Sequence, residues 1–194
     1  MSAASVDVKR SRKPLLDWYR ANKRAMPWRE TRDPYAIWIY EAMLQQTRVE
    51  TVIPYWQRFL TLFPDVHALA TAELDDVLGA WAGLGYYSRA RNLQKAAQAV
   101  VDEHGGRLPE TADLLRELPG IGRYTAGAIG SIAFGLREPL VDGNVARVFA
   151  RLFGIATPLS RADTQARLWS LAERLVNGPR PGALNQALME LGEI

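Results

Sequence analysis

Residues 33–47 read DPYAIWIYEAMLQQT and hold one carboxylate, Glu41, in a segment that otherwise looks built for burial. If this segment is helical, Ile37, Glu41 and Leu44 share one face, because residues three and four apart are neighbours on a helix. An ionised carboxylate is costly to bury, so the sequence predicts a raised pKa for Glu41 and a protonated side chain near neutral pH. Such a group suits general-acid catalysis. The alternative is a structural glutamate that pairs with a buried arginine.

A second carboxylate, Asp142, lies in LVDGNVARVFARLFG, at or just before the expected start of a helix. The helix dipole and the free N–H groups at that position favour an ionised side chain. Most aspartates at such positions only cap a helix. Together with Glu41, however, Asp142 supplies one proton donor and one anion, and breaking a glycosidic bond uses such a pair.

The segment ELPGIGRYTAGAI, residues 117–129, predicts two helices joined by a tight turn with two glycines. Gly120, Ile121 and Gly122 can present backbone N–H groups at a helix start, which suits a phosphate oxygen and needs no contact with a base. The sequence PGIG also occurs as an ordinary turn. Joined to two helices in a basic chain, it indicates a helix-hairpin-helix motif that binds DNA independently of sequence.

Apolar spacings of three and four predominate along the chain, and no convincing strand pattern appears, so the sequence predicts an all-α fold. Asp33 is expected to cap a helix that starts at Pro34, Thr47 and Glu50 to form a capping box for the next helix, and Pro54 to kink or restart it. The other expected helical ranges are a helix-loop-helix over 65–81, then 88–104, a short helix after Thr111 that ends near 118, 123–134, a helix from Asp142 or Asn144, 162–176 and 183–191.

Composition describes a folded globular protein of 194 residues, with 48% apolar residues and a net charge of +3. A basic balance favours a polyanionic partner, although many basic chains bind none. The surplus is concentrated in residues 1–32, which contain Lys9, Arg10, Arg12, Lys13, Arg20, Lys23, Arg24, Arg29 and Arg32 against Asp7, Asp17 and Glu30.

The chain contains no apolar run near the roughly 18 residues that a membrane span requires, and its polar start lacks the apolar core of a signal peptide. We therefore expect a cytoplasmic protein. The chain has no cysteine and only two isolated histidines, His67 and His104. The absence of cysteine excludes disulfides and thiolate ligation within the chain, and two isolated histidines do not form a metal cluster. The sequence therefore predicts no transition-metal site.

These motifs together resemble the helix-hairpin-helix DNA glycosylase superfamily, in which the hairpin is followed by a Gly/Pro-rich loop and an aspartate. Within the superfamily the chain is most similar to the A/G-specific adenine glycosylase (MutY) branch. The similarity extends from about residue 13 to 194 and includes MPWRETRDPY, EAMLQQT, WAGLGYYSRARNL, LPGIGRYTAGAI, VDGNVARV and NQALMELG.

The resemblance implies roles by position. Glu41 matches the general acid that protonates the departing adenine, and Asp142 matches the carboxylate that stabilises the oxocarbenium-like sugar. Asn144 matches a helper beside that aspartate, and Tyr124 matches a tyrosine near the sugar. The endonuclease III branch carries a Schiff-base lysine at the position of Tyr124. A phenol cannot replace that amine, so we expect a monofunctional glycosylase.

The resemblance also implies two groups of DNA contacts. Gln46, Thr47, Leu84 and Tyr86 match positions that enter the duplex around the extruded base and contact the opposite 8-oxoguanine. Arg24 and Trp28 match the adenine pocket, and Glu190 is a weaker candidate for it because a carboxylate near a helix end is usually solvated. Without the resemblance, Trp28 and Tyr86 could equally be core aromatics.

The chain departs from the family at two places. Tyr40, next to Glu41, stands where relatives usually carry serine, which concerns local packing. Relatives continue beyond MELG into four cysteines that hold a 4Fe-4S cluster and then into a further domain that helps to read 8-oxoguanine. This chain stops at Ile194 and cannot bind the cluster, so it is either a piece of a longer protein or a form that dispenses with the cluster.

The resemblance implies a monomeric, two-lobed fold with a DNA cleft between the lobes. The expected parts are a loose N-terminus over 1–12, a six-helix barrel lobe over 30–137 with the hairpin at about 112–134, and an incomplete second lobe from 13–29 and 138–194. The predicted reaction is hydrolysis of adenine from pairs with 8-oxoguanine or guanine in double-stranded DNA. The alternatives are an endonuclease III-like pyrimidine glycosylase and lyase, and a DNA-binding module without catalysis.

Overall fold

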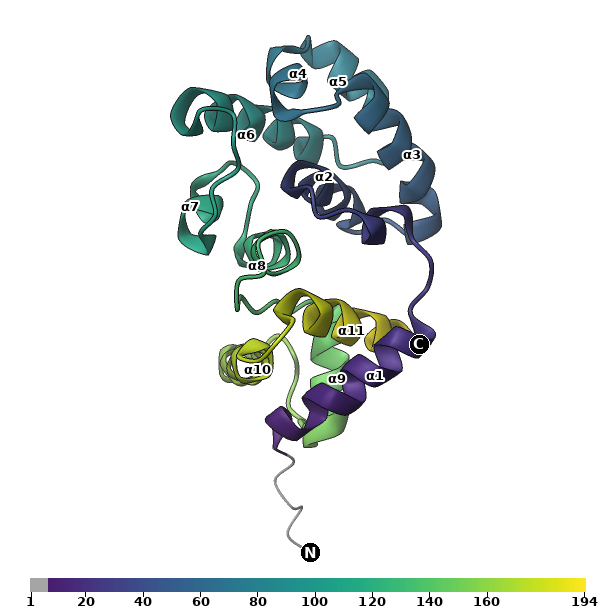
Figure 1. The fold of residues 1–194 in the computed structure, drawn as a ribbon, viewed down its shortest axis with the longest axis vertical. Coiled ribbons are helices and arrows are strands. Elements are labelled where there is room, and N and C mark those ends of the chain that lie inside the picture. The colour runs from purple at the N-terminus through teal and green to yellow at the C-terminus, as the bar shows by residue number, and fades with distance from the viewer. Residues whose placement is uncertain (1–6) are drawn as a thin grey trace, which may run out of the picture. The chain divides into compact units, whose positions relative to one another are not determined.

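Helices joined by short loops make up the protein (Figure 1). The computed structural model describes residues 7–194, and no strand occurs among them, which confirms the all-α prediction. The elements are η1 (Val8–Ser11), α1 (Arg12–Asn22), η2 (Pro27–Glu30), α2 (Pro34–Leu44), α3 (Val49–Leu62), α4 (Val66–Thr71), α5 (Leu74–Trp81), α6 (Ser88–His104), α7 (Ala112–Glu117), α8 (Arg123–Ile132), α9 (Gly143–Phe153), α10 (Ala162–Val176) and α11 (Pro181–Glu193).

The chain divides into two compact units. The first unit joins the N-terminal residues up to Arg24 to Gly130–Ile194, and the second unit is Ala25–Ile129. The second unit therefore consists of one continuous stretch of chain, whereas the first is built from both ends. The barrel and the cleft expected from the resemblance stay predictions.

Helix α2 is the central helix of the second unit. Asp33 caps it as predicted, because its carboxylate accepts hydrogen bonds from the backbone N–H groups of Tyr35 at 3.1 Å and Ala36 at 3.3 Å. Every residue from Tyr35 to Met43 is buried. A single buried face was expected from the spacing of Ile37, Glu41 and Leu44, but the helix is enclosed on all sides, which its nearly continuous apolar sequence permits.

The predicted capping box of Thr47 and Glu50 is wrong. Helix α3 begins at Val49, and its N-cap residue Arg48 makes no side-chain capping bond. The Thr47 hydroxyl instead accepts a hydrogen bond from Arg89 at 3.3 Å, so a tertiary contact replaces the local one. The helix also continues through Pro54 without a restart.

The remaining helices of the second unit follow local signals. Helix α6 has the predicted bounds and ends at Gly105, which adopts the left-handed conformation with φ of 61°. Thr111 caps α7 by accepting a hydrogen bond from the N–H of Leu114. Helix α8 ends at Ile132, two residues before the predicted end at Phe134.

The first unit packs α1, α9 and α10 around α11 and extends further toward the N-terminus than expected. Residues 1–6 of the predicted loose segment lie outside the described residues. Val8 in η1 is fully buried, and the Arg12 guanidinium donates to the carbonyl oxygens of Leu175 at 2.7 Å and Arg174 at 2.5 Å. These contacts fix residues 8–12, which corrects the expectation for that part of the segment.

Helix α11 starts at Pro181, two residues earlier than predicted, and makes close contact with the end of α8. A Cβ atom on Gly182 would lie 2.4 Å from the carbonyl oxygen of Ser131, so the two backbones meet where only glycine fits. The fully buried Asn185 donates from its amide nitrogen to Ser131 Oγ at 2.8 Å and to the Glu138 carbonyl at 2.9 Å. Close backbone approach and a buried amide therefore hold α11 to this segment.

Gly182→Ala is expected to lower the free energy of unfolding by about 2 kcal/mol or more, because the added methyl group meets backbone that must move. Gly79→Ala is the matched control, since no atom lies within 4 Å of the added carbon in α5. The control is expected to stabilise the protein by up to about 1 kcal/mol through helix propensity. Urea unfolding measures both, and equal stability of the two variants would contradict the predicted close contact.

Candidate active site

Glu41 lies in α2 with 2% of its surface exposed, so the predicted burial of this carboxyl group is confirmed. The residues before and after it in the helix, Tyr40 and Ala42, are also buried, as is Ile37 one turn earlier. The structure thus buries a carboxyl group within the second unit.

Asp142 is the N-cap of α9, as predicted, and accepts a hydrogen bond from the N–H of Val145 at 2.7 Å. The direction of its pKa shift differs from the expectation. Burial raises the pKa of the Asp142 carboxyl group, and the hydrogen bonds from backbone N–H groups offset this only in part. The sequence showed the helix start but not the loss of water around the side chain.

Asn144, in the first turn of α9, accepts a hydrogen bond at Oδ1 from Arg147 at 3.0 Å. The same Arg147 nitrogen donates to the carbonyl oxygen of Gly192 in α11. A Cβ atom on Gly192 would lie 2.4 Å from the Asn144 carbonyl oxygen. The start of α9, which carries Asp142 and Asn144, is therefore held against the end of α11.

The helix-hairpin-helix sequence forms the expected turn between α7 and α8. Gly120 has a φ of 79°, and a Cβ atom there would lie 2.8 Å from Asn92 Cβ, so the position requires glycine. The N–H of Ile121 donates to the Leu118 carbonyl at 3.1 Å, and its side chain is buried. The Ile121 N–H is thus used inside the turn, and the predicted phosphate contact stays with Gly120 and Gly122. Tyr124 lies half-buried in the first turn of α8.

Arg24 and Glu190 form an ion pair within the first unit. The Glu190 carboxylate is 4% exposed and accepts hydrogen bonds from Arg24 Nε at 2.7 Å, Nη2 at 3.2 Å and backbone N–H at 3.0 Å. Arg24 also donates to Glu193. Hydrogen bonds to Glu190 and Glu193 raise the pKa of Arg24. Glu190 was expected to be solvated near its helix end, but a partner 166 residues away in sequence buries it.

Trp28 is 4% exposed and belongs to an aromatic cluster of the second unit. Its ring stacks on Tyr40 with centroids 5.2 Å apart and meets Trp56 edge-on at 5.8 Å. In this structure Trp28 therefore packs as a core aromatic residue, which is the alternative given above. Arg24 belongs to the other compact unit, and an adenine pocket shared by Arg24 and Trp28 stays a prediction.

The four residues expected to enter the duplex differ in exposure. Gln46 and Tyr86 are exposed, Tyr86 by 61%, and Thr47 is partly buried. Leu84 departs from the expectation, because its side chain is only 6% exposed and packs inside the protein. Gln46 and Tyr86 both have positive φ, 59° and 48°, which is unusual for residues with side chains.

Sequence reasoning missed Arg89, the residue that connects the segments of these four residues. Its guanidinium donates to five backbone carbonyls and to the Thr47 hydroxyl. A signal was present: Arg89 lies in the first turn of α6, where the helix dipole disfavours a cation unless another partner compensates.

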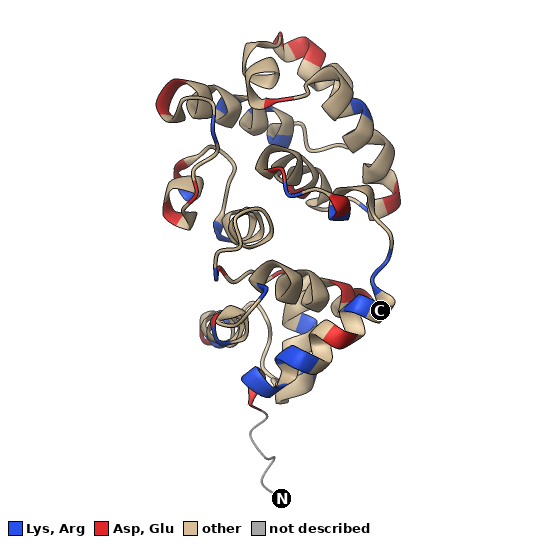
Figure 2. Ribbon diagram, in the orientation of Figure 1, with Lys and Arg blue, Asp and Glu red and all other residues tan. Residues whose placement is uncertain are grey.

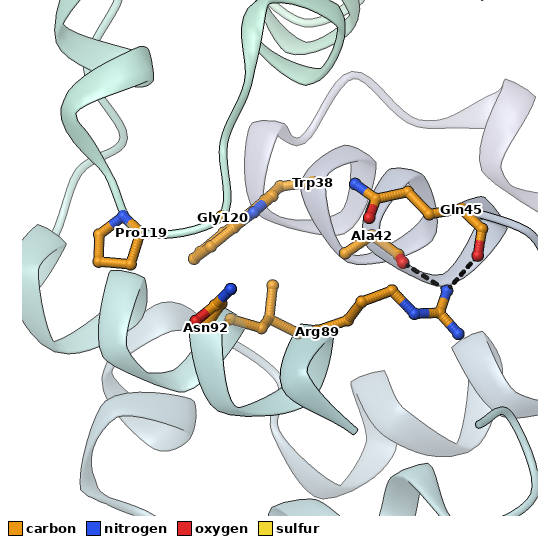
Figure 3. Close-up of a pocket in the computed structure, with 8 residues that line it drawn as sticks. Trp38, Ala42, Gln45, Arg89, Asn92, Pro119 and Gly120 are labelled. Atoms are coloured by element: carbon orange, nitrogen blue, oxygen red, sulfur yellow. Dashed lines mark hydrogen bonds between the residues drawn. The ribbon is translucent and has the colours of Figure 1, made fainter. Parts of the chain in front are cut away.

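A shallow pocket adjoins this arginine within the second unit (Figure 3). Trp38, Ala42 and Gln45 of α2 and its C-cap form one wall, and the hairpin contributes Pro119 and Gly120. The α6 residues Arg89, Asn92 and Leu93 complete the lining. Gln45 Nε2 also lies 3.5 Å from Thr125 Oγ1 in α8. The pocket thus places the hairpin beside the end of the helix that carries Glu41.

The basic surplus of the N-terminal segment is partly used inside the protein. Arg12 binds carbonyl oxygens of α10, and Arg24 binds two glutamates. One acidic residue, Asp17, lies between the basic positions of α1 (Figure 2) and pairs with Lys13 and Arg20. Net charge in this segment therefore overstates the positive charge that is available to a polyanion.

The described residues offer no helix long and apolar enough to cross a membrane. Among them, no three His, Cys, Asp or Glu side chains come close enough together to hold a metal ion. An iron-sulfur cluster needs cysteine thiolates, and the whole sequence contains none, so the residues present do not fit that group.

Comparison with known proteins adds the family. The model described as HhH-GPD superfamily base excision DNA repair protein matches residues 39–174. This range includes the buried Glu41, the hairpin and Asp142. The chain therefore belongs to the HhH-GPD superfamily of base excision DNA repair proteins.

Within this superfamily, the chain is similar to curated adenine DNA glycosylases. Human adenine DNA glycosylase is 50% identical over 96% of this chain and 36% of its own length. The adenine DNA glycosylase of Buchnera aphidicola from Acyrthosiphon pisum is 41% identical over 92% of this chain and 51% of its own length. The chain thus spans about a third to a half of the length of these relatives.

Solved structures support the fold. A thermostable thymine-DNA glycosylase superposes with a TM-score of 0.89 at 30% identity and covers 100% of this chain and 89% of its own. A trapped covalent complex of endonuclease III with DNA gives 0.73 at 23% identity, over 95% of this chain and 84% of that chain, which shows the fold alone.

Asp142→Asn is expected to become more stable relative to the unmodified protein as pH rises from about 3 to about 7. A carboxyl group whose pKa is raised by folding binds more protons in the folded state, so its contribution is lost as pH rises through the folded-state value. Asparagine does not titrate and can still cap the helix. Urea unfolding across this range measures the difference.

The control for this experiment is Asp65→Asn, which changes an exposed N-cap that accepts a hydrogen bond from the N–H of Ala68 at 2.8 Å. This variant controls for the change from a carboxylate to an amide at a solvent-exposed N-cap. An equal pH trend in the two variants would show that burial of Asp142 is not the cause.

Proposed function

We propose that this chain is a monofunctional DNA glycosylase that hydrolyses the N-glycosidic bond of adenine mispaired with 8-oxoguanine or guanine. The observation that carries the proposal is the carboxyl group of Glu41, only 2% exposed, in a chain that is 50% identical to human adenine DNA glycosylase. Burial in an apolar helix favours the protonated form of a carboxyl group, and that form is needed to donate a proton.

In the proposed reaction, Glu41 donates its proton to a ring nitrogen of the extruded adenine. The C1′–N9 bond then breaks, and its electron pair leaves with the neutral base. The sugar becomes an oxocarbenium-like cation, which water attacks at C1′, and the proton lost by that water passes to a carboxylate. The products are free adenine and an abasic site.

Asp142 is proposed to stabilise the sugar cation in its ionised form. The burial that raises its pKa also removes competing water, so an anion held there interacts more strongly with a nearby positive charge. Asn144 and Arg147 fix the helix start that carries it. Asn144 is therefore proposed as its helper.

We propose DNA contacts for the hairpin and for the turns that contain Gln46 and Tyr86. Gly120 and Gly122 offer backbone to a phosphate, and Gln46 and Tyr86 are exposed beside Thr47. Leu84 is proposed to support this surface from inside, because it is buried. For the adenine pocket, the ion pair of Arg24 with Glu190 supports a joint role, in which the carboxylate orients the guanidinium.

Glu41→Gln is expected to reduce single-turnover release of adenine from an 8-oxoguanine:adenine duplex by at least about 100-fold, because an amide cannot supply the proton. Glu50→Gln is the matched control, since Glu50 is exposed in the first turn of α3, and it should retain the unmodified rate. Equal rates for Glu41→Gln and the unmodified chain would exclude the assigned acid.

A parallel reaction with a guanine:thymine duplex distinguishes adenine release from the activity named for the thymine-DNA glycosylase neighbour. Duplex binding without release of any base would favour the alternative of a DNA-binding module.

Borohydride treatment during turnover is expected to trap no covalent protein–DNA adduct. The residue at the Schiff-base position is Tyr124, whose phenol cannot form an imine with the sugar aldehyde. Denaturing electrophoresis with labelled DNA makes the measurement, and an endonuclease III serves as the positive control. A trapped adduct would support the pyrimidine glycosylase and lyase alternative instead.

A further inference from the structure

The C-terminal end of α2 presents carbonyl oxygens that the helix itself cannot satisfy. The last turn of any α-helix leaves such groups, and in a buried helix another donor must replace water. Arg89 Nη1 lies 2.9 Å from the Ala42 oxygen and 2.7 Å from that of Gln45 (Figure 3). It also lies 2.8 Å from the Met43 oxygen. One guanidinium nitrogen therefore caps the helix that carries Glu41.

The second terminal nitrogen of the same guanidinium binds a different segment. Arg89 Nη2 donates to the carbonyl oxygens of Leu84 at 3.1 Å and Gly85 at 3.2 Å. The guanidinium carbon also lies 5.3 Å from the ring centroid of Trp81 and 5.6 Å from that of Tyr86. Nη2 also donates to the Thr47 hydroxyl at 3.3 Å, so Arg89 joins the turn at 45–47 to the turn at 84–86.

Each of these turns contains one residue in the left-handed region, Gln46 with φ of 59° and Tyr86 with φ of 48°. The remaining side-chain-bearing residue with positive φ in the described part of the chain, Arg180, lies in the other unit. Such conformations are unfavourable for residues with side chains and persist only where surrounding contacts impose them. Gln46 and Tyr86 are also exposed, so little packing of their own side chains imposes them.

We propose that Arg89 is a positioning residue that holds the Gln46 and Tyr86 turns in one fixed arrangement, so that both side chains can enter a duplex together when a base is extruded. This inference rests on the proposed glycosylase function and deepens it. A lysine cannot do the same, because its single ammonium group lacks the planar fork that reaches both turns and stacks on the aromatic rings.

The test compares Arg89→Lys with Arg91→Lys. Both variants keep the net charge and lie in α6, and Arg91 is exposed. Hydrogen exchange reports the two turns directly. The Thr47 N–H donates to the Leu44 carbonyl at 3.2 Å, and the Leu84 N–H donates to the Trp81 carbonyl at 3.1 Å. The N–H of Ile121 in the hairpin serves as an internal reference. Arg89→Lys is expected to speed exchange of the first two amides about tenfold or more and to leave the reference unchanged.

The second readout is base extrusion. A duplex with 2-aminopurine in place of the target adenine, opposite 8-oxoguanine, gains fluorescence when the base leaves the stack. Arg89→Lys is expected to lose most of this gain and about tenfold or more in single-turnover adenine release, with affinity for an unmodified duplex within about threefold. Arg91→Lys is expected to match the unmodified chain in amide exchange, fluorescence gain, adenine release and duplex affinity.

Failure of the inference can be distinguished from failure of the proposed function. If the unmodified chain extrudes and releases adenine but Arg89→Lys matches it, or if the loss also appears in Arg91→Lys, the positioning role is wrong while the function stands. If Arg89→Lys loses release with unchanged exchange and fluorescence, the role is also wrong. If the unmodified chain neither extrudes nor releases adenine, the proposed function is wrong and the inference fails with it.

Discussion

The enclosure of α2 on every side is the constraint on which the second unit depends. Every residue from Tyr35 to Met43 is buried, so each polar group of this helix needs a partner within the protein. Asp33 satisfies N–H groups at one end and Arg89 satisfies carbonyl groups at the other. The same enclosure that requires these two partners also removes Glu41 from water. A buried helix with charged groups at its ends thus explains both the stability of the scaffold and the chemistry proposed for it.

The first unit solves the same problem with different groups. Arg12 caps the end of α10, Arg24 neutralises the buried Glu190, and Asn185 satisfies two acceptors in the interior. Each bond offsets a desolvation cost and allows only one arrangement of the elements that it joins. Asp142 is the exception, because burial raises its pKa beyond what its hydrogen bonds offset. A group kept at such a cost is typical of a functional site rather than of a structural one.

Local sequence signals predicted most of the helices well. Gly105 ends α6 and Thr111 starts α7 where the patterns indicated, because caps and left-handed glycines act within a few residues. The capping box at Thr47 failed although its pattern was present, since Arg89 takes the hydroxyl. Distant partners also explain the burial of Glu190 and the fixed position of Val8. These errors share one cause, namely a contact with a residue far away in sequence.

The sequence by itself determined that the fold is helical, that Glu41 is buried and that Asp142 starts a helix, because spacing and capping are properties of neighbouring residues. It also identified the hairpin and, through its motifs, the superfamily. Only the tertiary structure decided that Leu84 is buried while Tyr86 is exposed, that Trp28 stacks in an aromatic core and that Arg89 joins two strained turns. These outcomes depend on desolvation and on contacts across the fold, which no local pattern of residues encodes.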